Sequence, residues 1–195
     1  MSQALRNFET SDGQQFAPSA VSPNGRFVLV WRDSDGKGCG GARATGKGRF
    51  WLFDERREIC KGELERPNGG CVSNQGRFAL EDWLFSSALV SAFHVFAPDG
   101  SALLKKRLRA NLSCCSIADD GNYSVCMTAC NPASSDSHAL FLFVLPSGTQ
   151  VWKEHPPFTP AHFEFAADGT QLAIRPGLGQ AHHHFTSCTL ATGQQ

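Results

Sequence analysis

The chain has 195 residues, of which 41% are hydrophobic and 10% aromatic, so it is long enough to bury a sizeable core as one domain. Its 18 basic and 18 acidic side chains balance, which disfavours binding to nucleic acid or to an anionic membrane surface. We therefore expect residues 1–195 to form a single domain that binds neither.

The first segment, residues 1–13, is polar and charged, and no window of the chain reaches about 18 uninterrupted apolar residues. A secretory signal and a membrane-spanning helix are therefore not expected, and we predict a soluble, cytoplasmic protein. In that compartment cysteines stay reduced, although their even number permits disulfides. The eight cysteines are Cys39, Cys60, Cys71, Cys114, Cys115, Cys126, Cys130 and Cys188.

A turn followed by a strand first occurs at residues 22–30 and recurs at 73–80, 118–125 and 166–174. Pro, Asn or Asp begins each turn, and glycine then supplies the positive φ that the turn requires. The turn glycines Gly25, Gly76, Gly121 and Gly169 are 51, 45 and 48 residues apart. This period is typical of a four-stranded propeller blade. In the fourth copy the apolar residues of the strand, Leu172 and Ile174, lie one position later than their equivalents in the other copies.

Residues 33–48 form a polar, glycine-rich insertion after the first of these strands. Residues 41–48 approximate a phosphate-binding loop, but Gly48 stands where Ser or Thr is needed, and a strand rather than a helix follows. The carboxylates of Asp33 and Asp35 are spaced like ligands of a calcium-binding loop, but the positive charges of Lys37 and Lys47 disfavour a cation there. We interpret the segment as a loop that carries binding residues. These candidates are Asp33, Asp35, Lys37, Arg43 and Lys47.

Apolar segments at 50–54, 92–97, 140–145 and 185–190 have the character of third strands, and polar segments at 101–109 and 149–155 that of outer strands. Adjacent strand residues point to opposite faces. Cys114 and Cys115 are thus expected to pack into two different interfaces between blades. For the same reason Glu81 and Asp82 are not expected to flank one substrate bond.

Further along the chain, residues 131–138 form a second polar insertion, and three histidines occur at 182–184. His182 and His184 share one face of an extended segment, so both can approach a zinc or nickel ion. Further candidate ligands are His155, His162 and Glu164. The alternative is a solvated cluster without metal, and we predict no cofactor.

The repeated segments resemble the blades of TolB-type and WD-repeat-like propellers, which open with Ser-Pro-Asp-Gly-Arg and an aromatic or aliphatic strand. Residues 22–26, Ser-Pro-Asn-Gly-Arg, are the most similar copy. The chain departs from the pattern because no Trp-Asp pair closes a blade, and because Gln75 and Asn122 replace the usual residues. The resemblance implies a β-propeller fold. Because the propellers that it resembles commonly bind protein partners, it also implies that kind of function.

The sequence therefore predicts an all-β, β-propeller-like fold of about four four-stranded antiparallel blades, with a β-sandwich as the alternative. The repeats span approximately 17–64, 70–109, 113–155 and 161–193, and residues 1–16 complete the last blade. That completion can occur within one chain, giving a small ring, or between two chains in a homodimer.

Functionally, we expect a non-enzymatic interaction scaffold that displays the loops 33–48 and 131–138 to a protein partner. One alternative is a hydrolase or lyase with its site near the central channel. Another is a propeller that binds a small molecule or sugar there.

Overall fold

A computed structural model of the chain describes residues 4–34, 46–84, 89–156, 160–166, 171–176 and 186–189. These residues form β-strands, turns and connecting segments, and no helix among them is long and apolar enough to cross a membrane. The predicted candidates Asp35, Lys37, Arg43, His182 and His184 lie outside the described residues.

The strands form four antiparallel sheets in which they follow one another in sequence order. The first sheet contains β1 (Ala4–Thr10), β2 (Gly13–Val21), β3 (Phe27–Arg32), β4 (Gly48–Asp54) and β5 (Arg57–Leu64). The second contains β6 (Pro67–Val72), β7 (Phe78–Asp82), β8 (Ser91–Phe96) and β9 (Ala102–Leu108). The third contains β10 (Leu112–Ile117), β11 (Tyr123–Thr128), β12 (Leu140–Val144) and β13 (Thr149–Glu154). The fourth contains β14 (Pro160–Phe165), β15 (Gln171–Pro176) and β16 (Thr186–Thr189).

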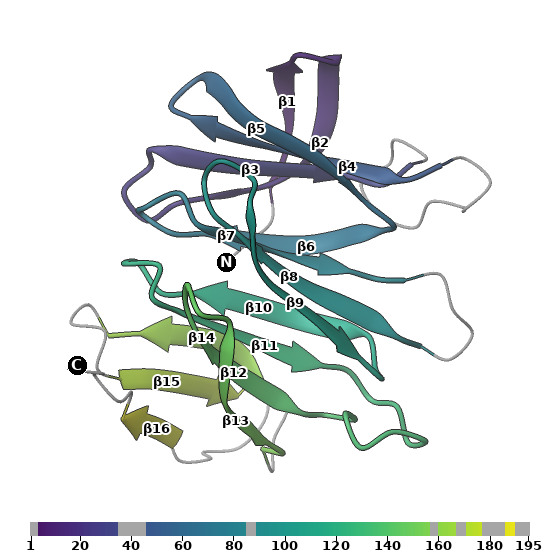
Figure 1. Ribbon diagram of the computed structural model, residues 1–195, viewed down its shortest axis with the longest axis vertical. Coiled ribbons are helices and arrows are strands. Elements are labelled where there is room, and N and C mark those ends of the chain that lie inside the picture. The colour runs from purple at the N-terminus through teal and green to yellow at the C-terminus, as the bar shows by residue number, and fades with distance from the viewer. Residues whose placement is uncertain are drawn as a thin grey trace.

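The four sheets stack face against face in chain order, with the first and the fourth at opposite ends of the molecule (Figure 1). Each interface between successive sheets holds its own cluster of buried apolar side chains. This arrangement confirms the predicted all-β, propeller-like fold and differs from the two facing layers of a sandwich. The sheets form an open series, and the described residues do not close a small four-bladed ring.

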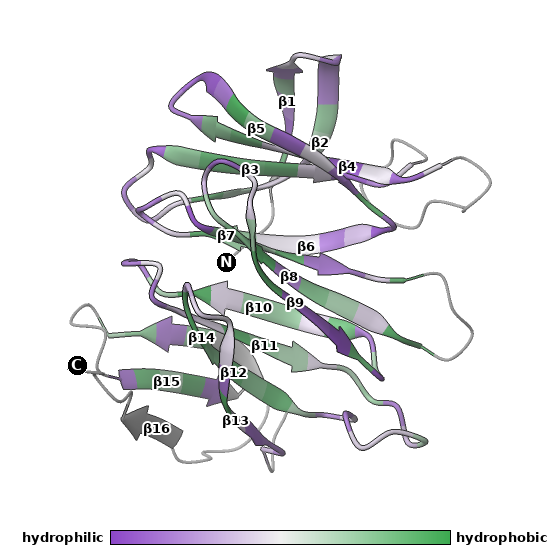
Figure 2. Ribbon diagram, in the orientation of Figure 1, coloured by the Kyte–Doolittle hydropathy of each residue, from purple (hydrophilic) through white to green (hydrophobic). Residues whose placement is uncertain are grey.

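Burial explains why the middle strands of each sheet are apolar on both faces. All five residues of β7 and all six residues of β8 are buried, because neighbouring sheets cover both sides of the second sheet. The outer strands β9 and β13 are mostly exposed or half-buried instead. Figure 2 shows that β9, unlike the middle strands, becomes hydrophilic toward its C-terminal end.

The predicted turns are present and contact one another across the sheets. Gly25, Gly76 and Gly121 have φ angles of 76°, 76° and 72°, as tight turns of this kind require. The backbone N–H of Asn24 donates to the side chain of Asn74 at 2.8 Å, and the backbone N–H of Asn74 donates to the carbonyl of residue 119 at 2.9 Å. The repeat therefore places equivalent turns side by side.

The N-terminal segment is placed differently from the sequence-based expectation. Residues 1–16 were expected to complete the last blade, but β1 pairs with β2 along Ala4–Ser19 to Thr10–Gly13, inside the first sheet. Only the end of β2 pairs with β3. The physical reason is local: a hairpin closed by the turn at residues 11–12 satisfies the backbone of both strands without a distant partner.

The β1–β2 hairpin lies against the face of the first sheet that the second sheet does not cover. Phe8 stacks on Phe53 with ring centroids 6.0 Å apart. The turn of the hairpin is held by ion pairs from Asp12 to Lys61 at 3.0 Å and to Arg49 at 3.4 Å. The hydrogen bond to Lys61 lowers the pKa of Asp12.

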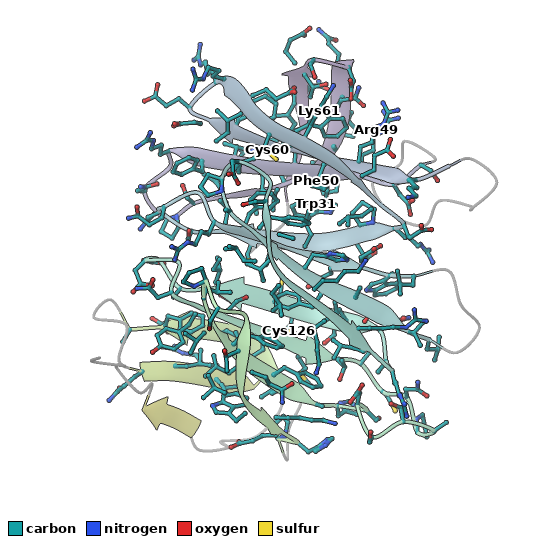
Figure 3. The ribbon with its side chains drawn as sticks, in the orientation of Figure 1. Trp31, Arg49, Phe50, Cys60, Lys61 and Cys126 are labelled. Carbon is teal, nitrogen blue, oxygen red and sulfur yellow. The ribbon has the colours of Figure 1, made fainter. Side chains whose placement is uncertain are left out.

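The interface between the first and second sheets is the most aromatic part of the core. Trp31 and Phe50 point into it (Figure 3), where Phe78 is fully buried between Phe50 and Phe96 at centroid distances of 5.6 and 5.1 Å.

Replacing Phe78 with alanine should lower the free energy of unfolding by about 3–5 kcal/mol, because it leaves a cavity between two sheets. Val151→Ala, at a side chain that is 45% exposed on β13, is the control and should change it by about 0.5 kcal/mol or less. Urea unfolding measures both. Equal effects of the two substitutions would contradict the stacked arrangement.

Candidate functional site

One side of the stack, at the right in Figure 1, carries the ends of β3, β7 and β11 and the starts of β4, β8 and β12. The segments that join β3 to β4, β7 to β8 and β11 to β12 begin and end on this side, and the described connections between successive sheets lie beside them. We call this surface the long-loop rim. Its described residues are 33–34, 46–47, 65–66, 83–84, 89–90, 109–111 and 129–139.

Asp33, a predicted binding residue, is fully buried at the start of the first loop. Its Oδ1 accepts a hydrogen bond from the backbone N–H of Ser34 at 2.7 Å, and its Oδ2 lies 3.4 Å from Nε of Arg66. A carboxylate in this position holds the loop to the connection between the first and second sheets. Lys47, at the other end of the loop, has a side chain that is 56% exposed and lies 3.8 Å from Glu65.

Asp82 holds the same connection from the second sheet. Its carboxylate accepts hydrogen bonds from the backbone N–H groups of Glu65 and Arg66 at 3.4 and 2.7 Å. The neighbouring Trp83 lies under the guanidinium of Arg66 at 5.9 Å and donates from Nε1 to the carbonyl of Leu112 at 2.9 Å. The rim is thus linked across three sheets by polar contacts.

The second predicted loop, residues 131–138, is held closely to the end of β9. The side-chain amide of Asn131 donates to the carbonyl of Arg109 at 2.7 Å. The carboxylate of Asp136 accepts from the backbone N–H of Arg109 at 2.8 Å and from Nζ of Lys153 at 2.8 Å. Burial favours the neutral form of Asp136, but these two hydrogen bonds outweigh it and lower the pKa.

A groove of about 480 Å³ opens on the rim between the second and third sheets. Arg107 and Arg109, both exposed, lie two positions apart in the extended chain and contribute one side of it. Leu89 has a φ of 52° and a side chain that is 45% exposed there. The lining residues are Leu89, Val90, Arg107, Arg109, Asn131, Ala133 and Ser134.

Sequence reasoning found the 131–138 loop but missed the other components of the groove. The charged residues of the segment 101–109 indicate only a polar outer strand. The available signal was that two arginines two positions apart share one face of a strand. Leu89 gave no such signal, because its exposure depends on how the second sheet meets the third.

In the part of the chain that the structure describes, no three His, Cys, Asp or Glu side chains are grouped to hold a metal ion. Glu164 pairs with Arg175 at 2.5 Å, and Nδ1 of His155 lies 3.0 Å from the carbonyl of Ser137. As expected, Glu81 and Asp82 diverge: Asp82 contacts the connection at residues 65–66, whereas Glu81 contacts Cys115.

The cysteines follow the predicted pattern of strand alternation. Cys115 packs in the cluster between the second and third sheets, and Cys114 packs in the cluster between the third and fourth. The six that the structure describes with their side chains are free thiols, namely Cys60, Cys71, Cys114, Cys115, Cys126 and Cys130.

Comparison with known proteins identifies the fold. No family model and no curated sequence matches the chain. A structure of HIRA(644-1017) superposes with a TM-score of 0.57 and 13% identity, covering 88% of this chain and 50% of that one. The β-propeller domain of Myceliophteria thermophila Cps50 (Swd1) gives 0.50 and 14%, covering 84% and 47%. Hydrazine synthase of Kuenenia stuttgartiensis gives 0.50 and 18%, covering 83% and 43%.

These similarities show a β-propeller-like fold for this chain, which spans about half the length of each of the three matched chains. The finer resemblance to TolB-type or WD-repeat blades stays a prediction from the repeated turns. A fold of this kind supports many unrelated activities, so the function has to be argued from the rim itself.

Replacing Asp33 with alanine should lower the free energy of unfolding by about 1–3 kcal/mol, because it removes the carboxylate that Ser34 and Arg66 contact. Lys47→Ala, at the exposed end of the same loop, should cost about 0.5 kcal/mol or less. Urea unfolding measures the free energy of unfolding of both variants. It distinguishes Asp33, which fixes the loop in place, from Lys47, which the loop exposes to solvent. A greater loss for Lys47→Ala would contradict this assignment.

Proposed function

We propose that this protein is a non-enzymatic interaction module that binds an acidic segment of a protein partner in the groove of the long-loop rim. The observation that supports the proposal is the groove itself. It lies where loops of two successive sheets meet, and it combines two exposed arginines with exposed apolar surface.

The charge of the groove favours an anionic ligand. Among the described residues, neither Arg107 nor Arg109 forms an ion pair through its guanidinium, so both are available to a carboxylate. Guanidinium groups bind carboxylates through paired hydrogen bonds, which gives orientation as well as affinity. The carboxylate of Asp136, which accepts a hydrogen bond from the backbone of Arg109, is already engaged by Lys153.

The apolar part of the groove favours a protein segment over a nucleic acid. Leu89 and Ala133 offer surface for an aliphatic side chain of the ligand, and none of the described residues that line the groove is an aromatic residue for base stacking. The balanced net charge points the same way. No acidic residue, histidine or cysteine lines the groove, so its described residues offer no acid–base pair or thiol for catalysis.

The hydrogen bonds around the groove support binding by a preformed surface. Asn131 and Asp136 fix the loop against Arg109 before any ligand arrives. A site that is already ordered loses less conformational entropy on binding, which raises its affinity for a short segment.

The direct test is selection of binders from a phage-displayed library of random dodecapeptides on the full chain. We expect the selected peptides to be rich in Asp and Glu and to contain an aliphatic residue. A double substitution, Arg107→Glu and Arg109→Glu, should weaken their binding by about 10- to 100-fold, because two charge-assisted contacts are lost. Fluorescence anisotropy of a labelled selected peptide measures the dissociation constants.

The matched control is the double substitution Arg56→Glu and Arg57→Glu. It makes the same charge change in the turn after β4 and at the first residue of β5, on the opposite side of the stack (Figure 1). It should leave peptide binding within about twofold. Equal weakening by both double substitutions would contradict the proposed groove, as would tighter binding of a random single-stranded oligonucleotide than of any selected peptide.

A further inference from the structure

Two cysteine side chains meet between the second and third sheets. Cys71 belongs to β6 and Cys115 to β10, and their Sγ atoms are 3.7 Å apart. Cys71 is 2% exposed, whereas Cys115 is half-buried. The two residues lie on adjacent strands of successive sheets, so a bond between them would cross an interface of the stack.

A buried carboxyl group adjoins this thiol pair. Glu81 of β7 is 5% exposed, and its carboxyl group interacts with the thiol of Cys115. Opposite it, Gly69 leaves the space that the carboxyl occupies, because a Cβ there would lie 2.8 Å from its Cδ and Oε2. Burial raises the pKa of Glu81 to about 7, so both of its protonation states are populated near neutral pH.

The packing of the interface does not explain a glutamate at this position. Among the described residues no cation forms an ion pair with Glu81, and burial of an unpaired carboxyl group destabilises a fold. An apolar side chain of similar size would fill the same space at lower free energy. Such a residue, placed beside two thiols, indicates chemistry rather than structure.

We propose that Cys71 and Cys115 form a thiol pair that hydroperoxides oxidise to a disulfide, with Glu81 as the general base that activates Cys115. The two thiols are already in contact, and the carboxyl group of Glu81 interacts with the thiol of Cys115.

The reaction proceeds in two steps that balance. The carboxylate of Glu81 takes the thiol proton of Cys115, whose sulfur attacks one oxygen of hydrogen peroxide. A bond forms between sulfur and oxygen, the bond between the two oxygens breaks, and the leaving hydroxide takes the proton from Glu81 to give water. The thiol sulfur of Cys71 then attacks the sulfenic acid of Cys115. The disulfide forms, and the hydroxyl group departs with the proton of Cys71 as a second water.

Without a base, the thiol of Cys115 would react slowly. The neighbouring Cys71 thiol and burial raise the pKa of Cys115, so it is protonated near neutral pH. Only the thiolate attacks a peroxide. A group that removes this proton at the moment of attack overcomes that limitation.

Cys126 provides the internal control, because it lies directly across β10 and β11 from Cys115 and is fully buried. The pair Cys115–Cys126 is the competing disulfide within one sheet. The contact between Sγ atoms favours Cys71 as the partner.

The test exposes the fully reduced chain to hydrogen peroxide, alkylates the remaining thiols and maps disulfides by tandem mass spectrometry. We expect a loss of 2 Da and a peptide pair linked through Cys71 and Cys115. Cys126→Ser should give the same product. Cys71→Ser should stop at a sulfenic acid on Cys115, which a 1,3-dione traps, and Cys115→Ser should give neither product.

Glu81→Gln tests the base separately, because the amide keeps the shape but does not accept the proton. It should slow disulfide formation about tenfold or more while melting at a temperature no lower than that of the unsubstituted protein. Oxidation of Glu81→Gln at the unsubstituted rate would overturn the role of Glu81. A link between Cys115 and Cys126, or equal thiol loss in Cys115→Ser, would overturn the thiol pair.

Discussion

The constraint on which the structure depends is that a sheet with two apolar faces is stable only when other sheets cover both of them. The second sheet shows this most clearly, since every residue of β7 and β8 is buried. Phe78 and Phe96 fill the interface with the first sheet, while Phe93 fills the interface with the third. Removing either neighbour would expose a complete apolar face to water.

The location of the long-loop rim follows from this stacking. Because successive sheets are copies in the same orientation, equivalent turns meet on one side of the stack and equivalent loops on the other (Figure 1). The loops of the second and third sheets therefore enclose a groove that neither sheet forms alone. The same pair of sheets brings Cys71 and Cys115 together from strands 44 residues apart in sequence.

Much of the fold could be predicted from the sequence, because it is specified locally. Turn glycines such as Gly25 and the alternation from Phe27 to Leu29 act within a few residues, and their repetition implied stacked sheets. The position of residues 1–16 could not be predicted, because an exposed strand can pair with its own hairpin partner or with a distant edge. Hairpin formation prevailed here.

The candidate site was predicted less well for a related physical reason. A polar residue in a loop has the same sequence signature whether it is displayed or buried as a hydrogen-bond acceptor. Asp33 is buried, because the backbone of Ser34 and the side chain of Arg66 supply its partners. Whether Arg107 and Arg109 border a groove depends on the loop from the next sheet, which the sequence of β9 does not contain.

The most direct test of the account is a measurement of amide proton nuclear Overhauser effects between the turns of successive sheets. The stacked arrangement predicts cross-peaks from the amide proton of residue 24 to side-chain protons of residue 74, and from the amide proton of residue 74 to the α-proton of residue 119. The first amide donates to Oδ1 of Asn74 at 2.8 Å and the second to the carbonyl of residue 119 at 2.9 Å. Absence of both cross-peaks in a folded sample, with contacts linking the turns of non-successive sheets instead, would contradict serial stacking.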